Sequence, residues 1–337
     1  MSDKQLIEEL QRGIAGRVLS APLAGTSDPP WYSLLAETGI AAFVTEMITA
    51  DGFYRGSRKT KGMLAIADSA GNLRRQYPDL GVPVFVQLFG HVPEAFAETA
   101  RFVEECGYDG IDLNYGCPAK KVIRSGNGAA QMRDIPLALE LAAATIENTR
   151  LPVTAKLRLG IDGERETYLQ LAEGLERLGV AALTLHPRTR EEQFLGHSDW
   201  SAIARLVEAV DCPVIGNGDI TSTADAWKMF EQTDCHAVMI GRALIRTPWL
   251  AGGIVKSLSG GVAATEIDWQ ERIRWTRRHG QMLAEYYGER NGMFRVRRFA
   301  LHYLRGVDGA RELRRQLATV ASLVELEERL NEAAELV

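Results

Sequence analysis

The chain lacks several features that would assign it to a special class of protein. No hydrophobic run reaches the ~20 residues needed to cross a bilayer, and the segment from Met1 to Arg17 is charged throughout, without the apolar stretch of a signal peptide. Cysteine is scarce, and no two cysteines are spaced as in a zinc knuckle or a C-x-x-C motif; they are Cys106, Cys117, Cys212 and Cys235. We therefore expect a cytoplasmic protein with free thiols and no metal site.

The overall charge gives little reason to expect a nucleic-acid partner, but its distribution does. With 46% hydrophobic and 25% charged residues, the composition is that of an ordinary globular protein, and the net charge is −5. The segment from Glu271 to Arg315 nevertheless holds twelve arginines, no lysine and five acidic residues, for a local charge of +7. A solvated helix face is one explanation. The exclusive use of arginine favours another, because its planar fork suits phosphate oxygens and stacks on bases.

Short apolar runs rich in β-branched residues recur along the first three quarters of the chain. Helix-like stretches lie between most of them, most clearly from Pro93 to Cys106, where Phe96, Ala100 and Val103 repeat at helical spacing. The eight runs are Val18–Ala21, Ala41–Met47, Val82–Phe89, Gly110–Asn114, Pro152–Leu159, Ala182–His186, Pro213–Asn217 and Ala237–Gly241. Eight strand–helix units predict an α/β fold with a closed parallel sheet, a (β/α)8 TIM barrel. An open doubly wound sheet is the rival, although no G-x-G-x-x-G follows the first strand.

The strand pattern ends near Trp249, and the loose stretch 257–265 resembles a linker. From Asp268 to the end, the sequence favours helices and shows no strand pattern. We expect a catalytic barrel over residues 1–255 and a small helical domain over 256–337 that carries the arginine cluster.

Active sites of such barrels lie at the carboxyl ends of the strands, and polar residues gather there. The strand ends are Gln87 to Gly90, Asn114 to Pro118, Lys156 to Arg158, His186 to Arg188, Gly216 to Asp219, and Gly241 with Arg242. The glycines of the last two strands leave backbone N–H groups uncovered before helices, an arrangement that favours phosphate. Tight turns alone would also explain these glycines.

Two rim residues suit a flavin, and a third suits proton transfer. A lysine inside the mouth, Lys156, is costly without an anionic or carbonyl partner and would stabilise the negative charge of a reduced flavin; a surface salt bridge is the alternative. Gln87 both donates and accepts, as the edge of an isoalloxazine requires. Cys117 lies between Gly116 and Pro118 just past a strand end, a position that holds a thiol at a defined point. A thiol is mostly protonated at neutral pH, so Cys117 can act as an acid.

Taken together, these residues resemble the dihydrouridine synthase family between Ser20 and Pro248, and the similarity continues more weakly through the helical domain over 256–337. The matching segments are Ala21–Pro22, Thr45 to Met47, Gln87–Leu88, Asn114 to Val122, Gly128 to Ala130, Lys156 to Arg158, Leu185 to Arg190 with Gln193 and Gly196, Gly216 to Asp219, and Gly241–Arg242. The chain departs from the family's usual pattern at Leu23, Pro187 and Gly90–His91.

The resemblance implies an FMN-dependent, NADPH-driven reduction of uridine to 5,6-dihydrouridine, with tRNA as the default substrate. It implies hydride transfer from FMN N5 to uracil C6 and proton transfer from Cys117 to C5. It places Asn114 and Arg188 against the uridine, which must be flipped into the mouth. It places the following residues against FMN: Pro22, Gln87, Lys156, His186, Asn217, Gly218, Asp219, Gly241 and Arg242.

Three other functions stay open at this point. The first is a small-molecule flavin oxidoreductase of the dihydroorotate or dihydropyrimidine type, since the fold alone cannot decide the substrate. The second is the same chemistry on ribosomal RNA. The third is a non-catalytic RNA-binding protein whose barrel has lost its enzymatic activity. The arginine-rich tail argues against the first, and the intact set of rim residues argues against the third.

Overall fold

The computed structural model describes residues 17–67, 73–77, 80–162, 167–261, 267–306 and 309–334. They form two compact units. The first unit comprises Met1–Ser27 and Ile40–Gly241, and the second comprises Asp28–Gly39 and Arg242–Val337. The expected helical domain over 256–337 lies within the second unit, and its role in binding RNA stays a prediction.

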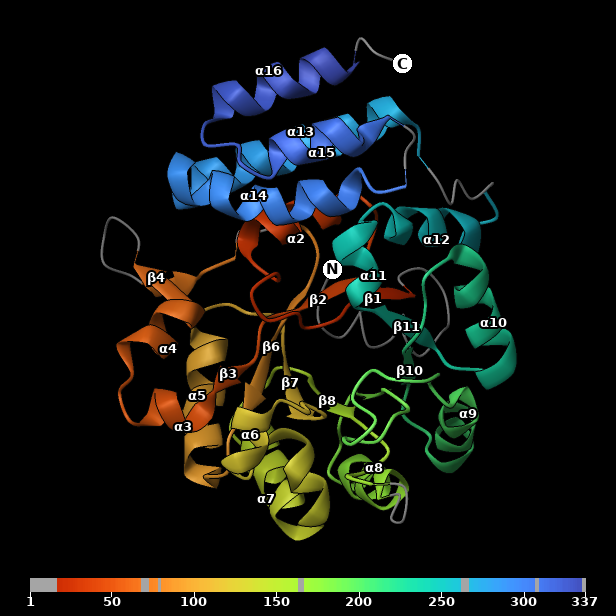
Figure 1. The fold of residues 1–337 in the computed structure, drawn as a ribbon. Coiled ribbons are helices and arrows are strands. Elements are labelled where there is room, and N and C mark those ends of the chain that lie inside the picture. Colours follow the sequence, from red (N-terminus) through yellow and green to blue (C-terminus); the bar gives the residue numbers. More distant parts are fainter. Residues whose placement is uncertain are drawn as a thin grey trace. The chain divides into compact units, whose positions relative to one another are not determined.

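The first unit is built around a ring of parallel strands (Figure 1). Within the described residues the ring consists of β1 (Val18–Ser20), β2 (Ala42–Val44), β6 (Val84–Phe89), β7 (Gly110–Tyr115), β8 (Val153–Leu157), β9 (Ala182–Leu185), β10 (Val214–Asn217) and β11 (Ala237–Ile240). Each strand pairs in parallel with the next, β1 pairs with β11, and β2 pairs with β6 through Phe43 opposite Val84. The ring is therefore closed. This confirms the predicted TIM barrel and all eight predicted strands, and it excludes the open sheet.

Three short strands were not predicted. The strand β3 (Ile48–Thr49) extends the edge of β6, while β4 (Ala65–Ala67) and β5 (Leu73–Arg75) form a separate antiparallel pair. The helices α3 (Ala50–Tyr54) and α4 (Arg58–Leu64) lie between β3 and β4 in the sequence. None of the three forms an apolar run rich in β-branched residues like those of the barrel: β3 has two residues, and β5 is Leu-Arg-Arg, so the sequence did not reveal them.

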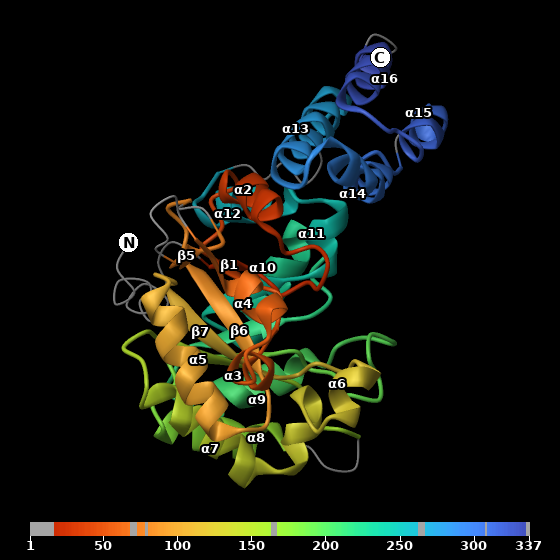
Figure 2. The same ribbon diagram turned by 90° about the vertical axis from the view of Figure 1, so that its left-hand side faces the viewer.

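Helices cover the outer face of the ring. They are α5 (Pro93–Glu105), α7 (Ile135–Ile146), α8 (Tyr168–Arg177), α9 (Trp200–Ala209) and α10 (Thr223–Thr233), each packed against the next. Figure 2 shows α5 and α7 side by side on the outer side of β6 and β7. The predicted helix from Pro93 is confirmed, because Phe96, Ala100 and Val103 are buried. Gly107, with φ of 77°, ends the helix in the left-handed conformation that glycine favours.

The barrel interior is filled rather than open. Its central cluster contains small and large apolar side chains from six strands or their ends: Leu19, Ala21, Ala42, Val44, Phe85, Ala182, Ile215, Ala237 and Met239. The interior is therefore a packed core, which also holds buried polar side chains such as Asp112 and Thr154.

The second unit is helical. It consists of α2 (Pro29–Ala36), α11 (Arg242–Arg246), α12 (Leu250–Leu258), α13 (Trp269–Tyr287), α14 (Glu289–Tyr303), α15 (Ala310–Leu317) and α16 (Leu323–Ala334). Trp31 of α2 stacks on Phe299 of α14 and lies next to His279 of α13, whose pKa is lowered to about 3 by burial. The predicted linker over 257–265 begins inside α12, and its residues 262–265 lie outside the described residues. No helix in the described part of the chain is long and apolar enough to cross a membrane.

Candidate functional site

A chain of buried polar side chains runs across three neighbouring strands of the barrel, β6, β7 and β8. Asp112 of β7 accepts hydrogen bonds from Thr154 Oγ1 of β8 (2.7 Å) and from Gln87 Nε2 of β6 (2.7 Å). Gln87 Oε1 in turn accepts from Asn114 Nδ2 (2.7 Å). Because all four side chains are buried and each is hydrogen-bonded to the next, their amide and carboxylate orientations are strongly determined.

This chain ends at the backbone of the predicted catalytic cysteine. Asn114 Oδ1 accepts hydrogen bonds from the N–H groups of Gly116 (3.1 Å) and Cys117 (2.9 Å). The loop is also held from the opposite side, since Ala129 N donates to Cys117 O (3.2 Å). A side chain at Gly128 would come within 2.9 Å of that same oxygen. The thiol is thus presented at a defined point beside the strand ends.

Cys117 is a half-buried free thiol, and its protonated form is favoured. Burial raises the pKa of Cys117, against the opposing effects of a backbone hydrogen bond from Ala119 and the positive charge of Arg158. All four cysteines are free thiols, as expected. A thiol that keeps its proton above neutral pH is suited to donate it during a reaction.

Lys156 is a half-buried cation whose hydrogen-bonding capacity is not fully used. Its Nζ donates to Asn217 Oδ1 of β10 (2.7 Å), and Asn217 Nδ2 donates to Met239 O of β11 (2.7 Å). An ammonium has three donors, and the described residues supply a partner for one. Burial lowers the pKa of Lys156 to about 7, Arg158 adds to this effect, and Asp112 opposes it. An anionic group placed here would restore the charged ammonium.

His186 is a neutral ring at the end of β9. Burial, reinforced by the charges of Lys156 and the nearby arginines, holds the pKa of His186 far below its ordinary value. The backbone at Gly218 passes close by, with φ of 133°, and an added Cβ would lie 3.2 Å from His186 Nδ1 and 3.0 Å from Ser198 Oγ. Only glycine fits this approach without strain. By contrast, position 216 requires glycine because of side-chain packing, since a Cβ there would lie 2.5 Å from Met229 Sδ.

The predicted substrate residue Arg188 is fully buried, at 1% exposure. Its guanidinium donates to Leu195 O (3.0 Å), to Gly196 O (2.8 Å) and to Asp219 Oδ2 (2.7 Å). Although burial acts in the opposite direction, hydrogen bonds from Arg188 and Ser198 lower the pKa of Asp219. In this arrangement Arg188 and Asp219 brace the loop after β9. The contact of Arg188 with uridine and the contact of Asp219 with FMN both remain predictions.

Two residues of the site were missed by sequence reasoning. Asp112 is an acid inside an apolar strand, two residues before Asn114 and so on the same face, which could have revealed it. Arg158 was named only as part of a strand end. In the structure it is buried and donates to Gly116 O (2.8 Å), Thr189 O (2.8 Å) and Gln193 O (2.9 Å). It therefore joins the loop that carries the cysteine to the loop after β9.

Three predicted cofactor residues lie outside this hydrogen-bonded set. Pro22 follows β1 and is half-buried. Gly241 follows β11, and a Cβ on it would lie 3.5 Å from Ala21 Cβ, so the ends of β1 and β11 are close together. Arg242 begins α11 in the second unit. Its contribution to the rim stays a prediction.

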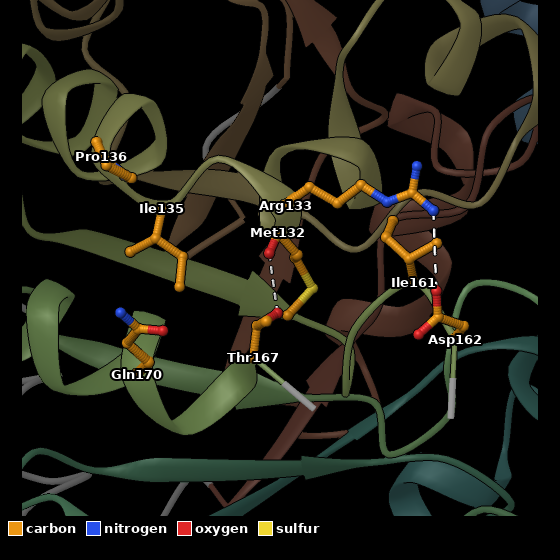
Figure 3. Close-up of a pocket in the computed structure, with 8 residues that line it drawn as sticks. All are labelled: Met132, Arg133, Ile135, Pro136, Ile161, Asp162, Thr167 and Gln170. Atoms are coloured by element: carbon orange, nitrogen blue, oxygen red, sulfur yellow. Dashed lines mark hydrogen bonds and ion pairs between the residues drawn. The ribbon is translucent and has the colours of Figure 1, made fainter. Parts of the chain in front are cut away.

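A pocket of about 470 Å³ lies apart from the rim residues (Figure 3). Its lining is Met132, Arg133, Ile135, Pro136, Ile161, Asp162, Thr167 and Gln170. Thr167 Oγ1 donates to Met132 O (2.9 Å), and Arg133 pairs with Asp162 at 3.8 Å. None of the hydrogen-bonded rim side chains lines this pocket, so it is separate from the candidate site.

The rim combines an ammonium with one hydrogen-bond partner, a neutral imidazole, three carboxamides and a protonated thiol. Such donors fit a planar, polar ring that carries negative charge when reduced, as a flavin does. The thiol adds a proton donor beside that ring. Among the described residues, no group of three or more His, Cys, Asp or Glu side chains is placed to hold a metal ion. The ammonium, the amides and the thiol together suit a reduction coupled to protonation.

Comparison with known sequences agrees with this chemistry. The family model described as dihydrouridine synthase matches residues 19–336. A probable tRNA-dihydrouridine synthase of Rickettsia bellii is 33% identical over 301 residues, covering 89% of this chain and 89% of that protein. tRNA-dihydrouridine synthase B of Pseudomonas aeruginosa is 35% identical, covering 90% of this chain and 88% of its own length. A probable tRNA-dihydrouridine synthase of Mycobacterium leprae is 37% identical, covering 86% and 74%.

Among solved structures, a 2-naphthoyl-CoA reductase complex resembles the chain with a TM-score of 0.53 and 11% identity. The similarity covers 73% of this chain and 50% of that larger one. At this identity the likeness concerns the fold alone.

Proposed function

The chain belongs to the dihydrouridine synthase family, and on that premise we propose that it reduces uridine to 5,6-dihydrouridine in tRNA, with FMN as bound cofactor and NADPH as reductant. The observation that carries this proposal is the joint placement of a half-buried, underused Lys156 and a protonated Cys117 at one end of the barrel. A reduction of a C=C bond needs both a hydride source and an acid: Lys156 would help to hold the reduced flavin that supplies the hydride, and Cys117 would supply the proton.

The residues that would hold FMN are the polar groups at the strand ends. Lys156 would place its ammonium against the pyrimidine-like edge of the ring, and Gln87 would offer a carboxamide edge, oriented by Asp112. Neutral His186 suits the polar edge of the cofactor, and Gly218, whose backbone lies against His186 and Ser198, keeps that histidine in place. When bound and reduced, FMN supplies a hydride to C6 of the uracil.

Cys117 completes the reaction by protonating C5. Its thiol is held by Asn114 through the loop backbone, and burial keeps the proton on sulfur at neutral pH. Asn114 Nδ2 already donates to Gln87 and lies 3.9 Å from Met47 Sδ. We therefore give Asn114 a positioning role toward Cys117, in addition to its predicted proximity to uridine.

The RNA-binding surface is proposed on the second unit. Several arginines there are used within the fold, as in Arg277 with Glu327. Others have no ion-pair partner among the described residues and are exposed: Arg290, Arg298, Arg305 and Arg311. Guanidinium groups without such a partner suit phosphate contacts, so RNA binding should weaken steeply as salt rises. Salt-independent binding would count against this surface.

The test is an absorbance spectrum of the purified protein under anaerobic conditions. Flavin bands that bleach with NADPH and return on addition of tRNA would support both the cofactor and the substrate class. Bands that return only with a free pyrimidine would instead favour a small-molecule oxidoreductase. Absence of flavin would favour a non-catalytic RNA-binding protein.

Cysteine variants separate the half-reactions. We expect Cys117→Ala to bind flavin and to be reduced by NADPH at a normal rate, and to lose RNA turnover by ~100-fold or more, as removal of a general acid does. Cys212→Ala is the matched control, since Cys212 is also a half-buried free thiol but directly precedes Pro213, at the opposite end of β10 from Asn217. Normal turnover in Cys117→Ala would remove Cys117 from the acid role.

A further inference from the structure

The loop after β9 presents two large apolar side chains to solvent. Leu195 is 76% exposed and Phe194 is 48% exposed, at the tip of a turn between Gln193 and Gly196. Both ends of this turn are in the left-handed conformation, with φ of 52° at Gln193 and 62° at Gly196. Exposed apolar side chains are not unusual singly, so the case for a contact surface depends on how this turn is held and on what lies next to it.

The turn is firmly attached to the barrel. Buried Arg188 donates to Leu195 O and Gly196 O at 3.0 and 2.8 Å, and buried Arg158 donates to Gln193 O at 2.9 Å. Hydrogen bonds from charged donors are among the stronger ones in proteins. The backbone of the turn is therefore held at a defined place, so little backbone entropy remains to be lost when a ligand arrives.

That place is next to the proposed catalytic groups. The Phe194 ring lies 6.1 Å, centroid to centroid, from the His186 ring, and its centroid is 5.4 Å from Arg158 Cζ. The same Arg158 guanidinium donates to Gly116 O, adjacent to Cys117. One side chain thus connects the exposed aromatic ring to the cysteine loop.

A uridine inside an RNA stack cannot reach a barrel mouth, so it must be extruded, at a cost in lost stacking. An aromatic side chain offsets part of this cost because every base has a face that can stack. An apolar side chain inserted beside the vacated position can offset more. Phe194 and Leu195 have the chemistry for these two tasks.

We propose that the Phe194–Leu195 turn holds the target uridine outside its RNA stack, with Phe194 contacting the extruded nucleoside and Leu195 occupying the gap that it leaves. This inference rests on the proposed function, since it assumes a uridine in folded RNA as substrate. It assigns to the barrel unit a part of RNA recognition that is independent of phosphate contacts.

The test compares two substrates in the oxidative half-reaction. Protein reduced with NADPH is mixed anaerobically with folded tRNA or with a short single-stranded oligoribonucleotide that contains uridine, and the return of the flavin absorbance is timed. For Leu195→Ala and Phe194→Leu we expect the rate with folded tRNA to fall by about tenfold relative to the rate with the oligoribonucleotide, in line with the strength of base stacking. Phe194→Tyr keeps the ring and should retain the wild-type ratio.

Ile66→Ala is the matched control, because Ile66 is a similarly exposed apolar residue (53%) on β4. It should change neither rate. Reduction by NADPH and the flavin spectrum should be unchanged in all variants, which establishes that the barrel is intact.

The outcomes separate this inference from the function on which it rests. Equal losses on both RNAs, or no loss on either, would overturn the role in extrusion while leaving the proposed reaction in place. A wild-type flavin that neither RNA reoxidises would overturn the proposed function itself, and the inference with it.

Discussion

Arg158 offers the sharpest test of how the site is assembled, because one buried guanidinium joins two loops and also sets the local charge. Replacing it by methionine keeps the apolar stem and removes both the hydrogen bonds and the charge. Replacing it by lysine keeps the charge and removes the planar fork. The pair of variants therefore separates geometry from electrostatics.

The size of the effect follows from the three backbone carbonyls that Arg158 satisfies, on Gly116, Thr189 and Gln193. Hydrogen bonds to a charged group contribute about 1.5–3 kcal/mol each, and methionine recovers part of this through apolar contact. We expect Arg158→Met to lower the free energy of unfolding by about 3–5 kcal/mol, the range for removing one partner of a buried charged set. In Arg158→Lys the free energy of unfolding should fall by about half as much, since an ammonium cannot reach all three oxygens at once.

The charge has a second consequence with a definite sign. Arg158 lowers the pKa of Cys117 and that of Lys156, although burial is the larger cause of each shift. Without the guanidinium, both pKa values should rise, and in Arg158→Lys they should stay near the wild-type values.

Urea unfolding measures the stability of the two Arg158 variants. The pKa of the Cys117 thiol is measured as the pH midpoint of its alkylation, followed by peptide mass spectrometry. The midpoint is preferred to the rate because a loosened loop would also change access to the thiol. A midpoint that falls in Arg158→Met, or a stability loss below about 1 kcal/mol, would refute this account of the residue.

Three further predictions address the cofactor side and the acid. Lys156→Met should raise the dissociation constant of FMN by about tenfold or more, because it removes a charged hydrogen-bond donor, and titration of deflavinated protein measures it. Gly218→Ala should cost about 1–3 kcal/mol in thermal unfolding, since φ of 133° is strained for alanine and its Cβ would crowd Ser198 and His186; an unchanged melting temperature would contradict this close packing of the backbone. Because burial raises the pKa of Cys117 above its ordinary 9.0, the proton-donating thiol persists through neutral pH, so RNA turnover should fall only above about pH 9. A decline centred near pH 7 would contradict it.

The fold could be predicted from the sequence because strands buried on both faces appear as continuous apolar runs. Each of the eight runs contains a strand of the barrel, and the helix from Pro93 begins where its proline predicts. What escaped prediction is local or depends on distant partners. The strand β3 has two residues, and α2 belongs with the second unit because Trp31 packs against Phe299, a contact across more than 260 positions of sequence. Periodicity carries no information on such a pairing.

The candidate site divides in a similar way. Residues at strand ends could be selected because the fold places all eight carboxyl ends at one rim. Their partners could not, since a hydrogen bond such as that from Lys156 to Asn217 joins positions 61 residues apart. Residue type and spacing alone do not distinguish Arg188, whose guanidinium is fully engaged with the loop after β9, from a residue that faces a ligand.

The charges at the rim are themselves informative about the ligand. Lys156, Arg158 and Arg188 bring three cations to the strand ends, and the carboxylates that oppose them are Asp112 and Asp219. Arg158 and Arg188 are held by backbone oxygens and Asp219, which leaves Lys156 with a neutral amide oxygen as its hydrogen-bond partner and a pKa drawn down to about 7. Burying a cation in this condition is unfavourable for the protein alone. An anionic ring edge in the mouth would raise the pKa of Lys156 again and favour the charged ammonium, and this agrees with a flavin as the ligand of the site.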